Sequence, residues 1–249
     1  MDTPLVIVAL GAVIGGFVQG LSGFAFGMVA MSIWAWSIDP RLAVVLAVFG
    51  GLTGQFIAAV TVRRGFDRRR IAPFIVGGLL GLPVGLWLLP QLDAPLFKTL
   101  LGALLVTWCP LMLMSGRLPQ IKFGGRWADG VAGAAGGVLG ALGGFTGAIP
   151  TLWCTLRGLE KDTQRSVIQN FNLSMLAVTF VSYLISGMVT IPMLPMLGIV
   201  ACAVLVPVLI GAKVYIRLSE AAFRRVVMIL LTVAGVTLLA SALPVLLNR

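Results

Sequence analysis

Eight long apolar segments separated by short polar loops constrain this chain more than any other feature. Hydrophobic residues make up 59% of the sequence and charged residues only 10%, whereas soluble domains carry about 25% charged residues. Six segments approach the ~20 residues that one membrane-spanning helix needs, and the first and fifth are longer. We therefore predict an all-α polytopic membrane protein with apolar segments at residues 4–38, 42–62, 71–90, 96–115, 128–156, 167–186, 194–212 and 223–247.

The charged and reactive residues exclude several classes of function. The formal net charge is +10, but the charges lie in short loops where the positive-inside rule explains them, so no nucleic-acid partner is expected. The chain has no histidine and no Asp or Glu deep inside an apolar segment, so we expect neither a proton relay nor an enzyme. The cysteines, Cys109, Cys154 and Cys202, lack ligand spacing and indicate no metal site or cofactor.

The two longest segments each contain a glycine-rich stretch, at residues 15–27 and 136–148. Each glycine inside a helix costs about 1 kcal/mol relative to alanine, so such stretches indicate broken helices. The alternative is close helix packing through small residues. At a shift of 121 residues the stretches share five identities, which are Gly15/Gly136, Gly16/Gly137, Leu21/Leu142, Gly23/Gly144 and Phe24/Phe145.

Weaker matches continue in the same order along the chain. Phe49 corresponds to Phe171, and Pro83 corresponds to Pro207. We therefore predict two tandem four-segment repeats, residues 1–115 and 126–249, each beginning with a broken or re-entrant helix. Residues 116–125 form a polar linker between them.

The distribution of basic residues predicts the topology. Of the 18 Lys and Arg residues, 15 fall in loops 63–70, 117–126, 157–165 and 213–225, which the positive-inside rule places in the cytoplasm. The fifth segment must then return to the side from which it entered. Its 29 residues are too few for two spans, which need ~40, so we predict a re-entrant hairpin of two half-helices that turns at residues 142–146.

The repeat extends this prediction to the first segment, which we expect to turn at residues 21–24. Each half would then cross the membrane three more times. The halves would be inverted, as in many transporters whose site lies at the membrane midplane. The linker 116–125 would be cytoplasmic and both termini would lie outside the cytoplasm.

A half-helix that begins inside the membrane directs unpaired N–H groups and a partial positive charge at one point, where an anion can bind. The hydroxyls at the two turns can donate to this ligand or merely cap the broken backbone. The polar sixth segment contains amides that face either the substrate or neighbouring helices. The candidate substrate-binding residues are Ser22, Gly23, Phe24, Gly143, Gly144, Phe145, Thr146, Gln169, Asn170 and Asn172.

The stretches GGFVQGLSGFAFG and GGVLGALGGFTGA, the loop RGLEKDTQR and the polar QNFNLS resemble the sulfite exporter TauE/SafE family of membrane permeases. The resemblance covers about residues 8–245. It implies transport of small sulfur-containing oxyanions such as sulfite or organosulfonates. Phe24 and Phe26 make the first turn bulkier than the family's glycine-rich form, which favours an anion with an apolar tail.

These observations together predict a secondary transporter that moves sulfite, a sulfonate or a related organic oxyanion by alternating access. We expect it in the bacterial cytoplasmic (inner) membrane as a multi-pass protein. The predicted partners are the anion, the lipid bilayer, a coupling ion (H⁺ or Na⁺) and a second copy in a homo-oligomer. An anion channel, a carboxylate carrier and a non-transporting scaffold subunit remain as alternatives.

Overall fold

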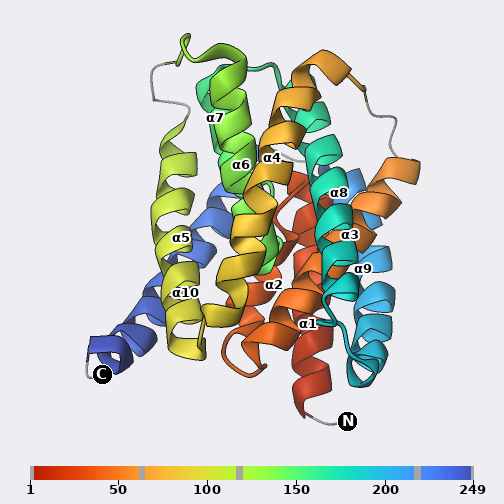
Figure 1. Ribbon diagram of the computed structural model, residues 1–249. Helices are drawn as coiled ribbons and strands as arrows, with labels where there is room; N and C mark the ends of the chain where they lie inside the picture. The colour runs from red at the N-terminus through yellow and green to blue at the C-terminus, as the bar shows by residue number, and fades with distance from the viewer. Residues whose placement is uncertain (1–2, 62–64, 116–119, 216–219, 248–249) are drawn as a thin grey trace.

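The computed structural model describes residues 3–61, 65–115, 120–215 and 220–247, and within these ranges the regular structure is entirely helical (Figure 1). Two short 3₁₀ turns, Leu89–Gln91 and Ile191–Met193, precede helices α5 and α9. The α-helices are α1 Thr3–Ser22, α2 Phe26–Trp34, α3 Pro40–Thr61, α4 Arg68–Leu88, α5 Ala94–Met114, α6 Gly125–Gly143, α7 Ala148–Leu156, α8 Lys161–Ile185, α9 Leu194–Tyr215 and α10 Glu220–Leu247.

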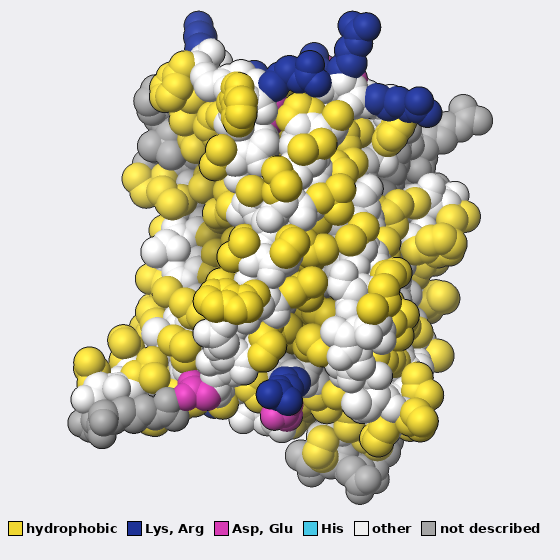
Figure 2. All heavy atoms as spheres, viewed as in Figure 1, with side chains coloured by type: hydrophobic (Ala, Val, Ile, Leu, Met, Phe, Trp, Pro, Cys, Tyr) yellow, Lys and Arg dark blue, Asp and Glu magenta, His cyan; other side chains and the backbone are white. Residues whose placement is uncertain are grey.

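Seven of the described helices are long and apolar enough to cross a membrane, namely α1, α3, α4, α5, α8, α9 and α10. Leucine, valine and isoleucine side chains cover their outer faces, as lipid contact requires (Figure 2). The predicted all-α polytopic membrane fold is therefore confirmed. Helix α6 is not among the seven, and its 19 residues include seven glycines.

Each of the two long predicted segments is a helix, a break and a second helix that runs back along the first. Trp34 at the end of α2 donates its indole N–H to the carbonyl of Ile7 near the start of α1, at 3.1 Å. Trp153 of α7 donates to the Asp129 carboxylate near the start of α6, at 2.8 Å. The chain therefore reverses direction at both breaks.

The arms of these hairpins are unequal, which corrects the prediction of two half-helices. Helices α1 and α6 have 20 and 19 residues, whereas α2 and α7 have nine each. At 1.5 Å per residue α1 is about 30 Å long, as long as the hydrocarbon core of a bilayer is thick. The long helix runs up to the break, whereas the return helix begins only after it, at Phe26 or Ala148, and ends at Trp34 or Leu156.

The glycines of the two stretches serve two purposes. Gly23 and Gly144 have φ values of +84° and +72°, a left-handed conformation that L side chains rarely adopt, and the helices end there. Gly20 lies inside α1, where a Cβ would collide with the carbonyl of Val208 on α9. Gly137 lies inside α6 in the same kind of contact with Gly78 of α4. Helix breaks and close packing both occur, at different glycines.

The long helix of each hairpin packs against a helix from the other half of the chain. Helix α1 packs along α9, α6 packs along α4, and α5 packs along α10. Helix α1 begins at the lower end of the molecule, and α6 begins at the upper end (Figure 1). An inverted pair of repeats would produce this arrangement, and the repeat with its boundaries stays a prediction.

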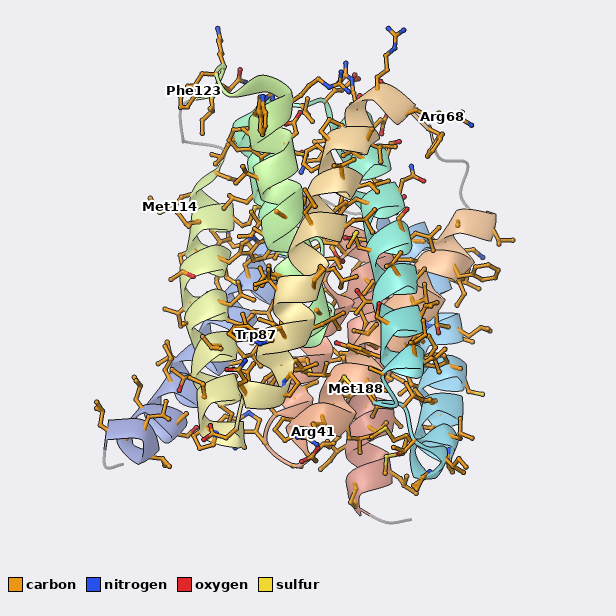
Figure 3. The ribbon with its side chains drawn as sticks, viewed as in Figure 1. Arg41, Arg68, Trp87, Met114, Phe123 and Met188 are labelled. Atoms are coloured by element: carbon orange, nitrogen blue, oxygen red, sulfur yellow. The ribbon has the colours of Figure 1, made fainter. Side chains whose placement is uncertain are left out.

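The basic loops gather at one end of the bundle (Figures 2 and 3). Ser166 at the start of α8 donates to the carbonyl of Gly65. The N–H of Ile121 donates to the carbonyl of Leu156 at the end of α7, at 2.8 Å. Residues 65–70, 120–126 and 157–165 therefore share an end, as the charge argument requires of the fifth segment. Of the other basic residues in the four loops, Arg63, Arg64, Arg117 and Arg217 lie outside the described residues.

Candidate functional site

The breaks of the two hairpins meet inside the bundle, so the predicted turns form one site. A Cβ on Gly27, in the first turn of α2, would lie 2.6 Å from the carbonyl oxygen of Gly143. A Cβ on Gly147 would lie 2.7 Å from the Cβ of Phe24. Only glycine lets the two backbones approach this closely. The start of α2 and the start of α7 are thereby brought to the same place.

At the first tip the serine hydroxyl serves the broken backbone. Ser22 Oγ donates to the carbonyl of Val18 at 2.8 Å and accepts from the N–H groups of Phe24 at 3.4 Å and Ala25 at 3.2 Å. This is the capping role that had been the alternative to ligand contact. The backbone of Gly23 continues the network, because its carbonyl accepts from the side-chain amide of Gln55.

At the second tip the threonine hydroxyl reaches a neighbouring helix. Thr146 Oγ1 donates to Asn172 Oδ1 of α8 at 2.8 Å. The Asn172 amide nitrogen also lies 2.9 Å from where a Cβ of Gly147 would be. Thr146 and Asn172 are each only 1% exposed. A hydroxyl and a carboxamide therefore stand together at the N-terminus of α7, where the helix N–H groups lack partners within their own helix.

Helix α8 brings one further predicted amide to the tips and directs the other away from them. The Gln169 amide nitrogen lies 3.3 Å from where a Cβ of Gly23 would be, and Gln169 is 3% exposed. Asn170 instead donates to the carbonyls of Gly65 and Ser166. Gln169 and Asn172 share a helix face because they are three residues apart, whereas Asn170 lies on the side of the basic loops.

The rings of the two predicted phenylalanines, Phe24 and Phe145, pack against different neighbours. Phe24 packs edge-on against Trp108 of α5, with ring centroids 5.6 Å apart. Phe145 folds over Gly143 and lines an apolar cavity of about 100 Å³ beside the leucines of α5. The Phe145 side chain therefore points away from Thr146, and only its backbone belongs to the tip.

Sequence reasoning missed three residues at this site. Trp108 contacts both hairpins, because its ring packs on Phe24 and its N–H donates to the carbonyl of Ala148 at 2.7 Å. Gln19 donates to the carbonyl of Gly51, and its Oε1 is buried with no hydrogen-bond partner among the described residues. Arg165, one turn before Gln169, lies 3.5 Å from the carbonyl of Gly20. Each is a polar or amphipathic side chain beside an apolar run, which was the available signal.

The resulting cluster suits a small anion and offers little for covalent chemistry. Two helix N-termini and the amide nitrogens of two carboxamides converge on a buried contact, and each can donate hydrogen bonds without a net charge. No lysine, arginine, aspartate or glutamate is among the tip residues 22–27 and 143–148. A ligand held here would be recognised by neutral donors, and it would have no nucleophile or general base beside it.

In the comparison with protein-family models, the chain matches Sulfite exporter TauE/SafE over residues 7–238. The chain belongs to the TauE/SafE family. Both hairpins and the polar part of α8 fall within the matched residues. Membership together with the seven apolar helices makes this an integral multi-pass membrane protein of a transporter family. Comparisons with curated proteins and with solved structures found no match.

Proposed function

We propose that this TauE/SafE protein is a secondary transporter for a small sulfur-containing oxyanion such as sulfite or an organosulfonate. The observation that carries the proposal is the buried meeting of two helix N-termini, one from each hairpin, beside Thr146 and Asn172. Helix N-termini bind anions through their N–H groups and their dipole. A trigonal or tetrahedral oxyanion has several acceptor oxygens, which matches several converging donors.

The site residues divide into backbone and side-chain contributors. The backbones at Gly23, Phe24, Gly143, Gly144 and Phe145 set the two tips, and Ser22 holds the first tip in shape. Gln169 and Asn172 supply the side-chain donors in this proposal, and the hydroxyl of Thr146, which donates to Asn172 Oδ1, orients the Asn172 amide toward the anion. Asn170 helps to place the basic loop at residue 65. The Phe24 ring, packed on Trp108, gives the anion's apolar portion a surface.

Burial of the cluster favours a carrier over a channel. Thr146, Gln169 and Asn172 are each at most 3% exposed, so an anion reaches them only after the bundle opens on one side. Two hairpins that begin at opposite ends (Figure 1) allow opening to either side in turn, which is alternating access. The end that carries the basic loops is cytoplasmic in this proposal, and the membrane is the bacterial inner membrane.

The coupling ion and the oligomeric state are further parts of the proposal. No Asp or Glu is among the buried residues of the described chain. Coupling by Na⁺ held on backbone carbonyls at the helix breaks therefore fits the described residues better than coupling by H⁺ through a buried carboxylate. A Na⁺ gradient should stimulate uptake into vesicles at constant pH, whereas a pH gradient alone should not. A homo-oligomer would place several such sites in one assembly.

Flux measurement in reconstituted liposomes tests the proposal. The purified protein in liposomes is given labelled sulfite, an alkyl sulfonate or the carboxylate of equal chain length. Each anion is tested with liposomes that contain the same anion unlabelled and with liposomes that lack it. A carrier gives saturable uptake that internal anion accelerates, and we expect sulfonate to exceed carboxylate. Linear uptake without acceleration would indicate a channel, preference for the carboxylate would indicate a carboxylate carrier, and no flux of any anion would leave the scaffold alternative.

A further inference from the structure

A groove runs between α4 and α6 on the lipid-facing flank of the molecule, away from the hairpin tips. Its volume is about 430 Å³, within the ~300–1,000 Å³ range of small-molecule sites. Ala72, Val76 and Leu80 form one wall, and Val131 and Ala134 form the other. The floor exists because Gly77 brings α4 against the backbone of α6, where a Cβ on Gly77 would collide with the carbonyl oxygen of Gly130.

One end of the groove carries a cation and an aromatic ring. Arg126 lines the groove at the start of α6, and no ion pair of Arg126 is found in the part of the chain that the structure describes. Trp127, also in the lining, is 87% exposed. Tryptophan and arginine together are typical of the headgroup level of a bilayer. The rest of the lining is apolar, so charge and apolar surface are separated along the groove.

The length of the groove matches one leaflet. From Arg126 to Ala134 the helix rises eight residues, or about 12 Å, and half of a ~30 Å hydrocarbon core is ~15 Å. Helices α4 and α6 both begin at the end where the basic side chains gather (Figures 1 and 2). The cation of the groove therefore lies at headgroup level, and its apolar walls lie at the depth of the acyl chains.

The matching positions of the first hairpin lack this chemistry. At the shift of 121 residues that aligns the two glycine stretches, Arg126 corresponds to Leu5 and Trp127 corresponds to Val6. Only the hairpin that starts at the basic end carries the cation. Anionic lipids are enriched in the cytoplasmic leaflet, and basic pockets between helices on that side bind their headgroups.

We propose that the groove binds one anionic phospholipid, with its phosphate at Arg126 and an acyl chain between Val76, Leu80 and Val131. The acyl chain would supply packing contacts that Gly77 and Gly130 lack, and it would thereby stabilise the packing of α6, the long helix of the second hairpin, against α4. A second copy of the protein is the competing occupant. Its described loops at that end, 65–70, 120–126 and 157–165, hold more basic than acidic residues, so the headgroup of an anionic lipid complements Arg126 better than a second copy does. This proposal is independent of the transported substrate.

Native mass spectrometry of the detergent-purified protein, titrated with phosphatidylglycerol or phosphatidylcholine, tests the proposal. The wild type should retain phosphatidylglycerol in preference. Because one arginine near anionic lipid contributes ~1 kcal/mol, Arg126→Gln should weaken phosphatidylglycerol binding about fivefold. Val131→Phe, at a side chain that is 67% exposed, should fill the groove without disturbing the core and reduce the binding of both lipids.

Arg68→Gln is the matched control, because Arg68 is an exposed cation at the same end that points away from the groove (Figure 3). It should leave lipid retention unchanged. An equal loss in Arg68→Gln and Arg126→Gln would overturn the proposal in favour of diffuse charge attraction. Unchanged retention in Val131→Phe would also overturn it. A dimer that persists without lipid and dissociates in Val131→Phe would assign the groove to a second copy of the chain.

Discussion

The two hairpins use the same backbone device and different polar chemistry. Each long helix ends at a glycine in the left-handed region, Gly23 or Gly144, and each is followed by a nine-residue helix that returns along it. The first tip is closed by its own serine, Ser22. The second tip sends Thr146 to Asn172 on α8. The break itself therefore needs glycine, while the polar groups around it are free to differ.

The open ends of the two hairpins, where each short helix lies beside the start of its long helix, are also held by different contacts. Trp34 binds a backbone carbonyl of α1. Trp153 and Arg157 both bind the carboxylate of Asp129, at 2.8 Å and 3.0 Å. The first hairpin is held by backbone and apolar contacts, and the second by charged side chains near the basic end. This difference teaches that two hairpins with the same kind of break can be anchored by different chemistry.

The largest expected effect is an all-or-none difference in labelling between the segments that follow the two hairpins, just after α2 and just after α7. Asp162→Cys and Ser37→Cys, each in a background without Cys109, Cys154 and Cys202, are treated in intact cells with a membrane-impermeant thiol reagent. The two positions lie at opposite ends of the bundle, so we expect Ser37→Cys to be labelled and Asp162→Cys to be protected until lysis. Labelling of both from outside would break the opposed orientation of the hairpins.

The next effect concerns the glycines of the two breaks. A β-branched residue at positive φ costs roughly 1–2 kcal/mol, and at Gly144 a Cβ would also press on the backbone of Ala47 at 3.3 Å. Gly144→Val should therefore lower transport about tenfold or more, since ~1.4 kcal/mol is a factor of ten. Gly23→Val should be milder, because its Cβ would meet the flexible Gln169 side chain.

Gly187→Val is the control for these two variants. Gly187 has the same φ as Gly144, +72°, and no atom lies within 4 Å of its Cβ position. Flux in vesicles and the melting temperature in detergent are measured for all three variants. Equal losses in Gly187→Val and Gly144→Val would show that backbone strain alone, and not the meeting of the tips, sets the effect.

Asn172→Leu should have an intermediate effect. It leaves the buried Thr146 hydroxyl without its partner, which costs ~1–3 kcal/mol, and it removes a proposed ligand donor. We expect flux to fall several-fold with normal membrane insertion. Asn170→Leu, on the neighbouring face, changes the same chemical group and should keep near-normal flux. Normal flux in a folded Asn172→Leu protein would remove this residue from the site.

The smallest effects should separate the two hydroxyls. Ser22→Ala removes a helix cap worth ~1 kcal/mol, so it should lower the melting temperature and leave the half-saturating anion concentration unchanged. Thr146→Val should raise that concentration about threefold or more, because it removes the hydrogen bond, worth ~0.5–1.5 kcal/mol, that orients the Asn172 amide. Concentration-dependent flux and thermal unfolding are measured for both. The reverse pattern would make the first tip the ligand-binding tip.

The sequence predicted the breaks because their causes are local. Glycine at residues 23 and 144 is required by backbone conformation, and the placement of basic loops at one end follows from charge alone. The three-residue spacing of Gln169 and Asn172 also set their common face. These features needed no knowledge of the partner helices.

Other features depend on contacts between distant segments, which spacing does not encode. The Phe145 side chain turns toward α5 because space exists there beside Gly143. The same is true of Trp108, whose two contacts come from different hairpins. The packing of α1 on α9 and of α6 on α4 joins the halves of the chain in a way that no internal match reveals.

The glycine contacts between helices have a mechanical consequence. Where Gly20 meets Val208, and where Gly77 meets Gly130, backbone rests directly on backbone, leaving no side chains that change rotamer as the helices shift. Helices α1 and α9 therefore form one stiff rod pair, and α4 and α6 form another. In the alternating access proposed above, these pairs, each built from both halves of the chain, are the bodies that move, and the hairpin tips are the surface on which they separate.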